Sequence, residues 1–380
     1  MTSIGTASAG AVFAGRQLRS TLSGEGVLTV ELVDHEWAAP TGSQILVKVE
    51  AAPINPSDLG LLFGPADTEN AEYSPGRVVA RVSQGAVQAL RARHGLSLPA
   101  GNEGAGTVVA AGEDPSAQAL LGKRVAAVPG TAYGTYAHAE ARMSLPLPDD
   151  VSAEQGASSF VNPMTALGFV ETMRAEGFIG LVHAAAASNL GQMLVRICRE
   201  DGVPLVNIVR SQAQVELLQG LGAKYVLDST DPAFTAHLAE AIGETGAMLG
   251  FDPIGGGTMA GRILTAMEAA ASRGAAYSPY GSSTPKRVYI YGGLDAGPTI
   301  LHRSFGLTWD LGGWLLFPFV TKAGPAVVTR MRERVMRDLT TTFASHYSDR
   351  VSLERMLTQE AVSRYTARRT GEKYLVLPNG

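Results

Sequence analysis

The chain has 380 residues, of which 45% are apolar and 17% are charged, and this composition excludes an intrinsically disordered protein. The length suits two domains, each able to bury its own core. The formal net charge of −4 leaves no basic field to hold nucleic acid or an anionic membrane. With one cysteine, Cys198, neither a disulfide framework nor a multi-cysteine metal site is possible.

The same features predict where the protein works. Segment 1–15 contains no lysine or arginine and therefore lacks the basic start of a signal peptide. The longest apolar stretch near the C-terminus, Leu311–Val320, is too short to cross a bilayer and contains Pro318. We expect a cytoplasmic protein that acts on a small molecule and has no nucleic-acid or membrane partner.

Up to Asp150, the chain has the pattern of strands separated by turns. Gln44–Ala52 alternates apolar and polar residues like a half-buried strand. Gly104–Ala111 and Arg124–Val128 are apolar runs bounded by glycine. These patterns predict a β-rich first domain.

One long segment, Phe63–Leu98, does not fit this pattern, because it is polar and contains prolines. A short helix is expected within it, at Gln84–Arg93. Segments of this length are often lids or binding loops. A surface insertion without a function explains the sequence equally well.

After Asp150 the pattern changes to alternating helices and strands. A helix is expected over Asn162–Glu176, with Pro163 near its start. Regular alternation of this kind predicts an α/β domain with a parallel, doubly wound sheet. The expected strands are Gly180–Ala186, Pro204–Val209, Tyr225–Leu227, Ala247–Phe251 and Arg287–Tyr291, and the helices between them are Gly191–Asp201, Gln212–Leu221, Pro232–Ile242 and Thr258–Ala271.

The last part of the chain returns to the first domain. Gly324–Leu339 has the pattern of an amphipathic helix, and Glu372–Leu377 that of a terminal strand. An aromatic group precedes them, which either covers a substrate pocket or forms a dimer surface, and we favour the dimer surface. The group consists of Trp309, Trp314, Phe317 and Phe319.

A strand, a turn of small residues and a helix follow one another over Leu181–Gly191, with the sequence LVHAAAASNLG. A dinucleotide needs this arrangement, because its diphosphate must approach the backbone and meet the N–H groups at a helix start. The turn departs from the usual G-x-G-x-x-G, since only Gly191 stands where the last glycine belongs. An ordinary strand–helix turn is the alternative.

The end of the next strand indicates which dinucleotide is bound. NAD enzymes place an acidic residue there for the ribose 2′-hydroxyl, whereas NADP enzymes use an arginine for the 2′-phosphate. The chain has Arg210 at this position and no acidic residue before Glu216. The position predicts NADPH rather than NADH, although a solvated surface arginine is the alternative.

Two glycine clusters, Asp252–Gly257 and Tyr291–Leu294, follow later predicted strands. Ligands of open α/β sheets bind at the carboxyl ends of the strands. A plain turn explains either cluster alone, but two clusters in register favour a ligand.

Eight motifs in a fixed order resemble the medium-chain dehydrogenase/reductase superfamily, most closely its quinone oxidoreductase and enoyl-thioester reductase branches. The resemblance spans Gly42 to the C-terminus. It implies a GroES-like β-rich catalytic domain over 1–157 and 316–380, and a Rossmann NADP-binding domain over 158–315. The motifs are NPSD (Asn55–Asp58), GNEGAG (Gly101–Gly106), GTYA (Gly134–Ala137), NPMTAL (Asn162–Leu167), the turn that ends at Gly191, FDPIGG (Phe251–Gly256), YGGL (Tyr291–Leu294) and EKYLVLP (Glu372–Pro378).

Zinc enzymes of this superfamily bind their catalytic metal through two cysteines and one histidine. The matching positions here are Asn55, Asn102 and Val161. Amide and valine side chains do not replace thiolate and imidazole as zinc ligands. The resemblance therefore implies an enzyme without a metal site.

The resemblance also assigns residues to the cofactor. The residues expected to contact the nicotinamide, the diphosphate and the 2′-phosphate are taken from the motifs and positions described above. Lys373 lies in a C-terminal motif that approaches the cofactor in relatives, and an exposed strand lysine is the alternative. The predicted cofactor-binding residues are Asn162, Thr165, Ser188, Asn189, Leu190, Gly191, Arg210, Gly255, Tyr291, Gly292, Gly293, Leu294 and Lys373.

Hydride transfer without a metal needs groups that stabilise the developing charge and supply a proton. We predict Asn55, Tyr73 and Tyr133 as catalytic residues, with Asn55 donating a hydrogen bond to the oxyanion and a tyrosine supplying the proton. Tyr136, Ser57 and water are further proton sources. Barrel packing is the stronger explanation for Tyr133 and Tyr136.

These inferences predict an NADPH-dependent oxidoreductase, working as a homodimer, that reduces a quinone, an enone or enal, or an enoyl thioester. One departure counts against the enoyl thioester. Enoyl-thioester reductases have a tyrosine shortly after NPSD, and Leu59–Ala66 has none. A catalytically weak NADPH-binding sensor or structural protein is the alternative.

Overall fold

The computed structural model describes residues 11–380, so most of the segment inspected for a signal peptide lies outside the described residues. The chain forms two compact units. Unit 1 runs to Val161 and resumes over Arg334–Gly380, and unit 2 comprises Asn162–Glu333. No helix in the described part is long and apolar enough to cross a membrane.

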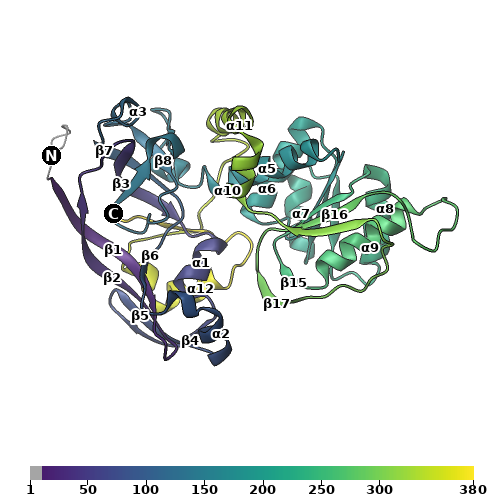
Figure 1. Cartoon of the computed structure of the whole chain (residues 1–380), viewed down its shortest axis with the longest axis horizontal. Coiled ribbons are helices and arrows are strands. Elements are labelled where there is room, and N and C mark those ends of the chain that lie inside the picture. The colour runs from purple at the N-terminus through teal and green to yellow at the C-terminus, as the bar shows by residue number, and fades with distance from the viewer. Residues whose placement is uncertain (1–10) are drawn as a thin grey trace. The chain divides into compact units, whose positions relative to one another are not determined.

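A five-stranded antiparallel sheet in unit 1 is built on a long hairpin of β1 (Val12–Leu22) and β2 (Val27–Ala38). Figure 1 shows this hairpin, with β4 (Ala66–Ser74) and β5 (Arg77–Val82) beside its lower part. β5 pairs with β2, and β6 (Ser97–Pro99) borders β1.

The segment Phe63–Leu98 contains the strands β4 and β5 and is thereby part of the sheet of unit 1. Its strand β5 alternates buried and accessible residues, with Val78, Ala80 and Val82 buried. This alternation attaches the segment to the core of unit 1. The expected short helix is present as α2 (Gln84–Ala89), followed by a 3₁₀ turn at Arg91–Arg93.

The second sheet of unit 1 has seven strands arranged around β3 (Gln44–Pro53). β7 (Gly104–Ala111) lies so close to β3 that a Cβ at Gly106 would be 2.0 Å from the carbonyl oxygen of Lys48, so only glycine fits there. The other strands are β8 (Arg124–Ala127), β9 (Tyr136–Glu140), β10 (Leu145–Pro146), β19 (Asp349–Val351) and β20 (Tyr374–Val376).

The C-terminal strand β20 pairs antiparallel with β3, as the sequence predicted. The pairing brings the residue before it, Lys373, to the carboxyl end of β3. The helices that lie wholly in unit 1 are short. Besides α2 they are α1 (Pro56–Leu62), α3 (Pro115–Gln118), α4 (Ala153–Gly156) and α12 (Gln359–Thr366).

Unit 2 contains the predicted doubly wound sheet, which has six parallel strands in the order β13-β12-β11-β14-β16-β18. The order reverses between β11 and β14, which in such sheets is the place where ligands bind. The strands are β11 (Leu181–His183), β12 (Leu205–Val209), β13 (Tyr225–Asp228), β14 (Leu249–Asp252), β16 (Lys286–Ile290) and β18 (Trp309–Gly313).

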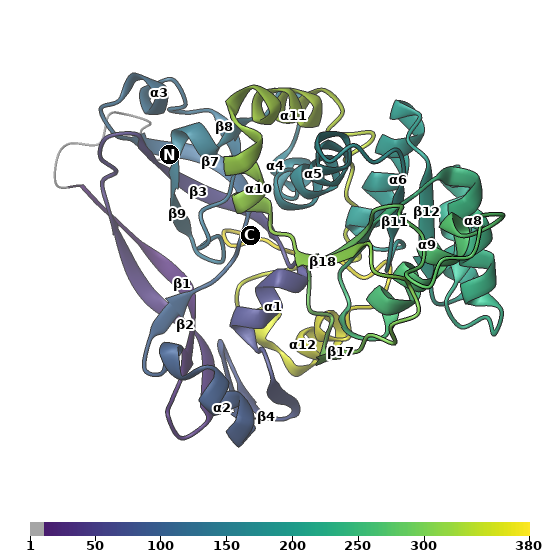
Figure 2. The same ribbon diagram turned by 45° about the vertical axis from the view of Figure 1, so that its right-hand side comes forward.

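Helices cover both faces of this sheet, with α5 and α6 on one side and α8 and α9 on the other (Figure 2). Because both faces are covered, the strands are nearly continuous runs of buried residues. The helices are α5 (Val161–Ala175), α6 (Asn189–Asp201), α7 (Gln212–Gly220), α8 (Phe234–Thr245), α9 (Met259–Ala271), α10 (Leu316–Ala323) and α11 (Pro325–Arg337).

The boundary near the C-terminus differs from the division drawn from the sequence. Residues 316–333 belong to unit 2, whereas we expected them in the first domain. The aromatic group explains this, because Phe319 of α10 stacks on Trp314, with ring centres 5.3 Å apart. Trp314 in turn packs against Phe169 of α5 and donates a hydrogen bond to Thr172. Most of the aromatic group is thus packed inside unit 2.

A buried ion pair joins α9 to the start of β16. Lys286 Nζ lies 2.7 Å from the Glu268 carboxylate, and the Lys286 side chain is fully buried. Ser282 donates to Glu268 from its backbone N–H and its hydroxyl. Burial alone would raise the pKa of Glu268, but the hydrogen bonds from Lys286 and Ser282 outweigh it and lower the pKa to about 2.

We expect Lys286→Met to lower the free energy of unfolding by about 3–5 kcal/mol, because it leaves a buried carboxylate without its counter-charge. Urea denaturation measures this. The ionised Glu268 stabilises the wild-type fold at pH values above the ordinary pKa of a glutamate. The difference in unfolding free energy between wild type and Lys286→Met should therefore shrink as the pH falls from about 5 toward 2. The control is Arg350→Met, which removes the exposed ion pair with Glu154 and should change stability by less than about 1 kcal/mol. Equal effects of both variants would contradict the role of the buried pair.

Candidate functional site

The turn between β11 and α6 has the geometry of an anion cradle. Ser188 precedes α6, and its hydroxyl accepts a hydrogen bond from the backbone N–H of Gly191 at 3.1 Å. A Cβ at Gly191 would lie 2.1 Å from the carbonyl oxygen of Ala186, so only glycine allows the helix to start this close to the turn. Ala185 adopts a positive φ of 49°, a strained conformation that is typical of functional turns. The first turn of a 13-residue helix therefore presents its N–H groups beside the carboxyl end of a central strand.

Arg210 stands immediately after β12, the strand beside β11. Its side chain is exposed, and its backbone N–H donates to the Gln214 side chain. The first acidic residue beyond it, Glu216, is engaged by Gln212. The strand end therefore carries a positive charge and no acidic side chain, as the sequence predicted for a 2′-phosphate site.

The two glycine clusters pack against each other. Gly255 has a φ of +79°, and a Cβ there would lie 2.9 Å from the carbonyl oxygen of Gly292. A Cβ at Gly292 would lie 2.7 Å from the carbonyl oxygen of Pro253. Close contact between the loops requires glycine at both positions, whether or not a ligand binds there.

Tyr291 and His183 form a buried pair behind these loops. The Tyr291 hydroxyl lies 2.7 Å from His183 Nε2. Burial lowers the pKa of His183 to about 3, so the imidazole is neutral at physiological pH. The Tyr291 hydroxyl is therefore already engaged inside unit 2. Beyond it, Gly293 has open space around its Cα, and Leu294 is 39% exposed.

The other predicted cofactor residues of unit 2 lie on two helices. Asn162 and Thr165 are on the first turns of α5, and Thr165 is buried. Asn189 and Leu190 form the first turn of α6 beside Gly191. The structure thus brings the residues from Ser188 to Gly191 together as one turn.

Unit 1 contains a buried polar cluster around Asn55 and Glu103, both fully buried. The Asn55 amide Nδ2 donates to Glu103 Oε1 at 2.9 Å. Glu103 Oε2 accepts from the backbone N–H groups of Phe160 and Val161, at 3.1 and 2.8 Å. The carboxylate therefore fixes the amide of Asn55 and the start of α5. Asn55 Oδ1 is buried and has no hydrogen-bond partner among the described residues.

Lys373 supplies the positive charge of this cluster. Its Nζ is buried without a hydrogen-bond partner in the described part of the chain, and it lies 5.9 Å from the ring centre of Tyr347. Burial lowers the pKa of Lys373 to about 8, and the charges of Glu103 and Asp58 limit the fall. Burial raises the pKa of Glu103, which Lys373 opposes. Lys373 is therefore not the exposed strand lysine that we considered.

Asp58 is the second carboxyl group of the cluster. Its two oxygens accept hydrogen bonds from the backbone N–H groups of Asn55 and Asn102, both at 2.8 Å. Burial raises its pKa to about 7 despite these bonds. Asp58 thus ties the start of α1 to the loop before β7.

The predicted tyrosines are engaged within unit 1. The Tyr73 hydroxyl donates to the carbonyl oxygen of Thr68 at 2.7 Å, and the fully buried Tyr133 hydroxyl donates to that of Pro53 at 2.9 Å. Tyr136 packs edge-on against Trp37. The hydroxyl of Ser57 accepts from Asn102 Nδ2. Packing accounts for Tyr136, and the donor capacity of Tyr73 and Tyr133 is already used.

Sequence reasoning missed Glu103. It stands in GNEGAG, an acidic residue directly before a strand that is buried along its whole length on one face. An acid at such a place needs partners, and that signal was available. In residues 11–380, no group of three or more His, Cys, Asp or Glu side chains could hold a metal ion.

No family model matches the chain. It is 29% identical over 214 residues to the mitochondrial enoyl-[acyl-carrier-protein] reductase of Bos taurus, a match that covers 54% of this chain and 50% of that protein. The chain thus spans about half the length of the curated relatives it matches.

Solved structures match almost the whole chain. A protein from Mesorhizobium loti assigned to the NADPH:quinone reductases is 26% identical, with a TM-score of 0.72 over 96% of this chain and 98% of that one. The complex of Etr1p with NADP and crotonyl-CoA is 16% identical and has a TM-score of 0.64 over 96% of this chain and all of that one. In sequence and fold the chain is similar to these NADPH:quinone reductases and enoyl reductases. The predicted resemblance and the predicted fold class are confirmed.

Glu103 accepts hydrogen bonds from three donors, the Asn55 amide and the backbone N–H groups of Phe160 and Val161, and its removal should be costly. We expect Glu103→Ala to lower the free energy of unfolding by more than about 3 kcal/mol, since each unsatisfied buried donor costs about 1–3 kcal/mol. Glu103→Gln retains one acceptor oxygen and should cost less. Urea denaturation measures both.

The matched control is Glu25→Ala, which removes an exposed carboxylate and should change stability by less than about 0.5 kcal/mol. A loss for Glu103→Ala no larger than that of the control would show that the carboxylate does not hold the cluster together.

Proposed function

We propose that this protein is an NADPH-dependent oxidoreductase that delivers hydride to a small activated carbonyl or carbon–carbon double bond, without zinc. The observation that carries the proposal is the Ser188–Gly191 turn, with Arg210 at the end of the adjacent strand. The names of the similar proteins, NADPH:quinone reductase and enoyl reductase, support the same reaction class. The substrate is then a quinone, an enone or enal, or an enoyl thioester.

The residues of unit 2 fit a dinucleotide phosphate. Gly191 lets the start of α6 pack against the carbonyl of Ala186, and the N–H groups at the start of this helix suit a diphosphate. Arg210 would pair with the 2′-phosphate. Asn162, Thr165 and the loop Gly292–Leu294 would hold the nicotinamide end. When bound, NADPH supplies the hydride.

Unit 1 would supply the polar groups that act on the substrate. Asn55 keeps one N–H beyond the bond to Glu103, and we propose that it donates to the oxyanion that develops during reduction. Glu103 positions this amide. Lys373 Nζ, with a pKa of about 8, holds a proton near neutral pH and can release it. Tyr73 and Tyr133 are weaker candidates for the proton donor than Lys373, because carbonyl oxygens already accept hydrogen bonds from their hydroxyls.

We further propose a homodimer in the cytoplasm. Leu315 and Phe317, 63% and 47% exposed on unit 2, are apolar side chains that an interface would cover. The single cysteine, Cys198, is buried, which is compatible with a reducing compartment.

The reaction is tested by following NADPH oxidation with a panel of quinones, enals, enones and enoyl-CoA thioesters. We expect turnover with at least one class, and lower kcat after Asn55→Ala, because the oxyanion loses a donor worth about 10²–10³-fold. Binding of NADPH, measured separately, should stay within about twofold in this variant. Tight NADPH binding with no turnover above background across the panel would reject the reductase and favour a sensor or structural protein.

Coenzyme choice is tested by Arg210→Glu. Because the variant places a carboxylate where the 2′-phosphate would bind, KM for NADPH should rise at least about tenfold, while KM for NADH should change little. Arg273→Glu, a reversal at an exposed arginine after α9, is the control and should affect neither coenzyme. Equal changes in both KM values for Arg210→Glu would refute the 2′-phosphate contact.

A further inference from the structure

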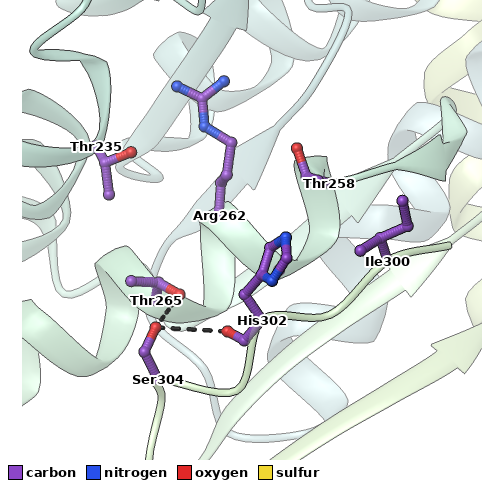
Figure 3. Close-up of a pocket in the computed structure, with 8 residues that line it drawn as sticks. Thr235, Thr258, Arg262, Thr265, Ile300, His302 and Ser304 are labelled. Atoms are coloured by element: carbon purple, nitrogen blue, oxygen red, sulfur yellow. Dashed lines mark hydrogen bonds between the residues drawn. The ribbon is translucent and has the colours of Figure 1, made fainter.

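A cavity of about 210 Å³ lies beside the start of α9 in unit 2. Figure 3 shows its lining side chains, which come from α9, from the start of α8 and from the segment 300–304. The polar ones are four hydroxyls, one imidazole and one guanidinium, and no lining residue is acidic. They are Thr235, Thr258, Arg262, Thr265, His302 and Ser304.

The local sequence explains why the cavity forms here. A Cβ at Gly261 would lie 3.3 Å from the carbonyl oxygen of Ile300, so glycine lets the segment 300–304 run close to α9. The hydroxyls of Thr265 and Ser304, 3.0 Å apart, join the two elements. Thr258 precedes α9 without a side-chain cap, so no side-chain oxygen satisfies the first N–H groups of the helix.

Arg262 is a half-buried cation without an acidic partner. Its guanidinium lies 4.2 Å from the centre of the Phe234 ring, and Nη1 lies 3.4 Å from the carbonyl oxygen of Ser229. Burial lowers the pKa of Arg262, and no carboxylate contributes to that pKa. Figure 3 shows the guanidinium rising from α9 between Thr235 and Thr258. A charge in this position is stabilised when an anion pairs with it.

We propose that this cavity binds a small oxyanion of the phosphate class, with Arg262 as its counter-charge and the hydroxyls of Thr235 and Thr258 as further donors. The guanidinium offers a fork of N–H groups that matches phosphate oxygens. Several hydroxyls around one centre suit a tetrahedral group with many acceptor oxygens better than a planar carboxylate. The volume lies below the roughly 300–1,000 Å³ of pockets for drug-sized ligands, so the ligand is small.

The residues that line the cavity differ from those proposed for the coenzyme, although the two sets are neighbours. Arg262 Nη1 donates to Ser229, whose backbone N–H donates to Val209, the residue before Arg210. The proposed coenzyme residues Ser188–Gly191 and Arg210 follow β11 and β12, whereas the cavity is lined from α8, α9 and the segment after β17 (Asp295–Thr299). The inference therefore does not depend on the proposed reaction.

Isothermal titration with inorganic phosphate tests the site in the full-length protein. We expect saturable binding that Arg262→Gln weakens at least about tenfold, as the loss of a charge-assisted hydrogen bond predicts. Arg303→Gln removes a neighbouring exposed arginine that does not line the cavity, and Arg210→Gln removes the other predicted phosphate contact. Both should leave the Arg262-dependent binding within about twofold.

Thr235→Val guards against misfolding, because it leaves Arg262 and Phe234 in place and should still weaken phosphate binding. Urea denaturation of each variant identifies any loss of fold.

Tighter binding of methyl phosphate than of phosphate would support an ester as the ligand, and weaker binding would support free phosphate. Acetate that binds as well as phosphate would overturn the phosphate class. Binding that is absent in wild type, or that depends on Arg210 and not on Arg262, would overturn the site and leave the proposed reductase untouched.

Discussion

The parallel pairing of β11 with β12 on one side and β14 on the other is the constraint on which unit 2 depends. Parallel strands end at the same edge, so the chain leaves β11, β12, β14 and β16 on one side of the sheet. The turn to Gly191, Arg210 and the two glycine loops meet there for this reason alone. Their sequence separation of more than 100 residues is bridged by backbone hydrogen bonds and not by contacts among the functional side chains.

A different constraint shapes unit 1, where buried charge must be balanced. Two carboxyl groups, Asp58 and Glu103, lie fully buried and accept hydrogen bonds from the backbone of three separate segments. The terminal strand β20 brings Lys373 to them by pairing with β3. The polar cluster is therefore assembled from both ends of the unit. Because the charge of each of these groups shifts the pKa of the others, the charge of the cluster belongs to the set and not to any one residue.

Much of the fold could be predicted from the sequence, since the periodicity of apolar residues and the positions of glycines indicate most helices and strands. The alternation of Gln44–Ala52 corresponds to β3, and the helical pattern of Asn162–Glu176 to α5. The predicted strand Gly180–Ala186 was too long, because Ala184–Ser188 form the turn into α6. The strands within Phe63–Leu98 were not predicted, since β4 has an almost wholly accessible, polar sequence and pairs with β5 through the backbone. The alternation of apolar and polar side chains gives no sign of a strand that is held by backbone hydrogen bonds alone.

The site was harder to predict than the fold, for a physical reason. The turn at Gly191 and the arginine after β12 are local features, and the sequence placed them correctly. The partners of a buried side chain are not local: Tyr133 and Pro53 are 80 residues apart, and Asn55 and Glu103 are 48 apart. Whether a tyrosine is a free donor or an engaged one depends on which carbonyl the fold brings to it.

Pairing also separates the arginines of unit 2 into two groups. Arg287 forms ion pairs with Glu176 and Asp310, and Arg174 with Glu171 and Asp201. The charges of these two arginines are therefore balanced within the protein. The hydrogen bond to Asp310 raises the pKa of Arg287, as expected for a cation held by carboxylates. Arg210 and Arg262 form no ion pair with any residue of the described chain. A protein with more acidic than basic side chains could readily have paired them. A guanidinium without a carboxylate partner can pair with an anionic ligand where further donors stand beside it, as the start of α6 does for Arg210 and the cavity hydroxyls do for Arg262.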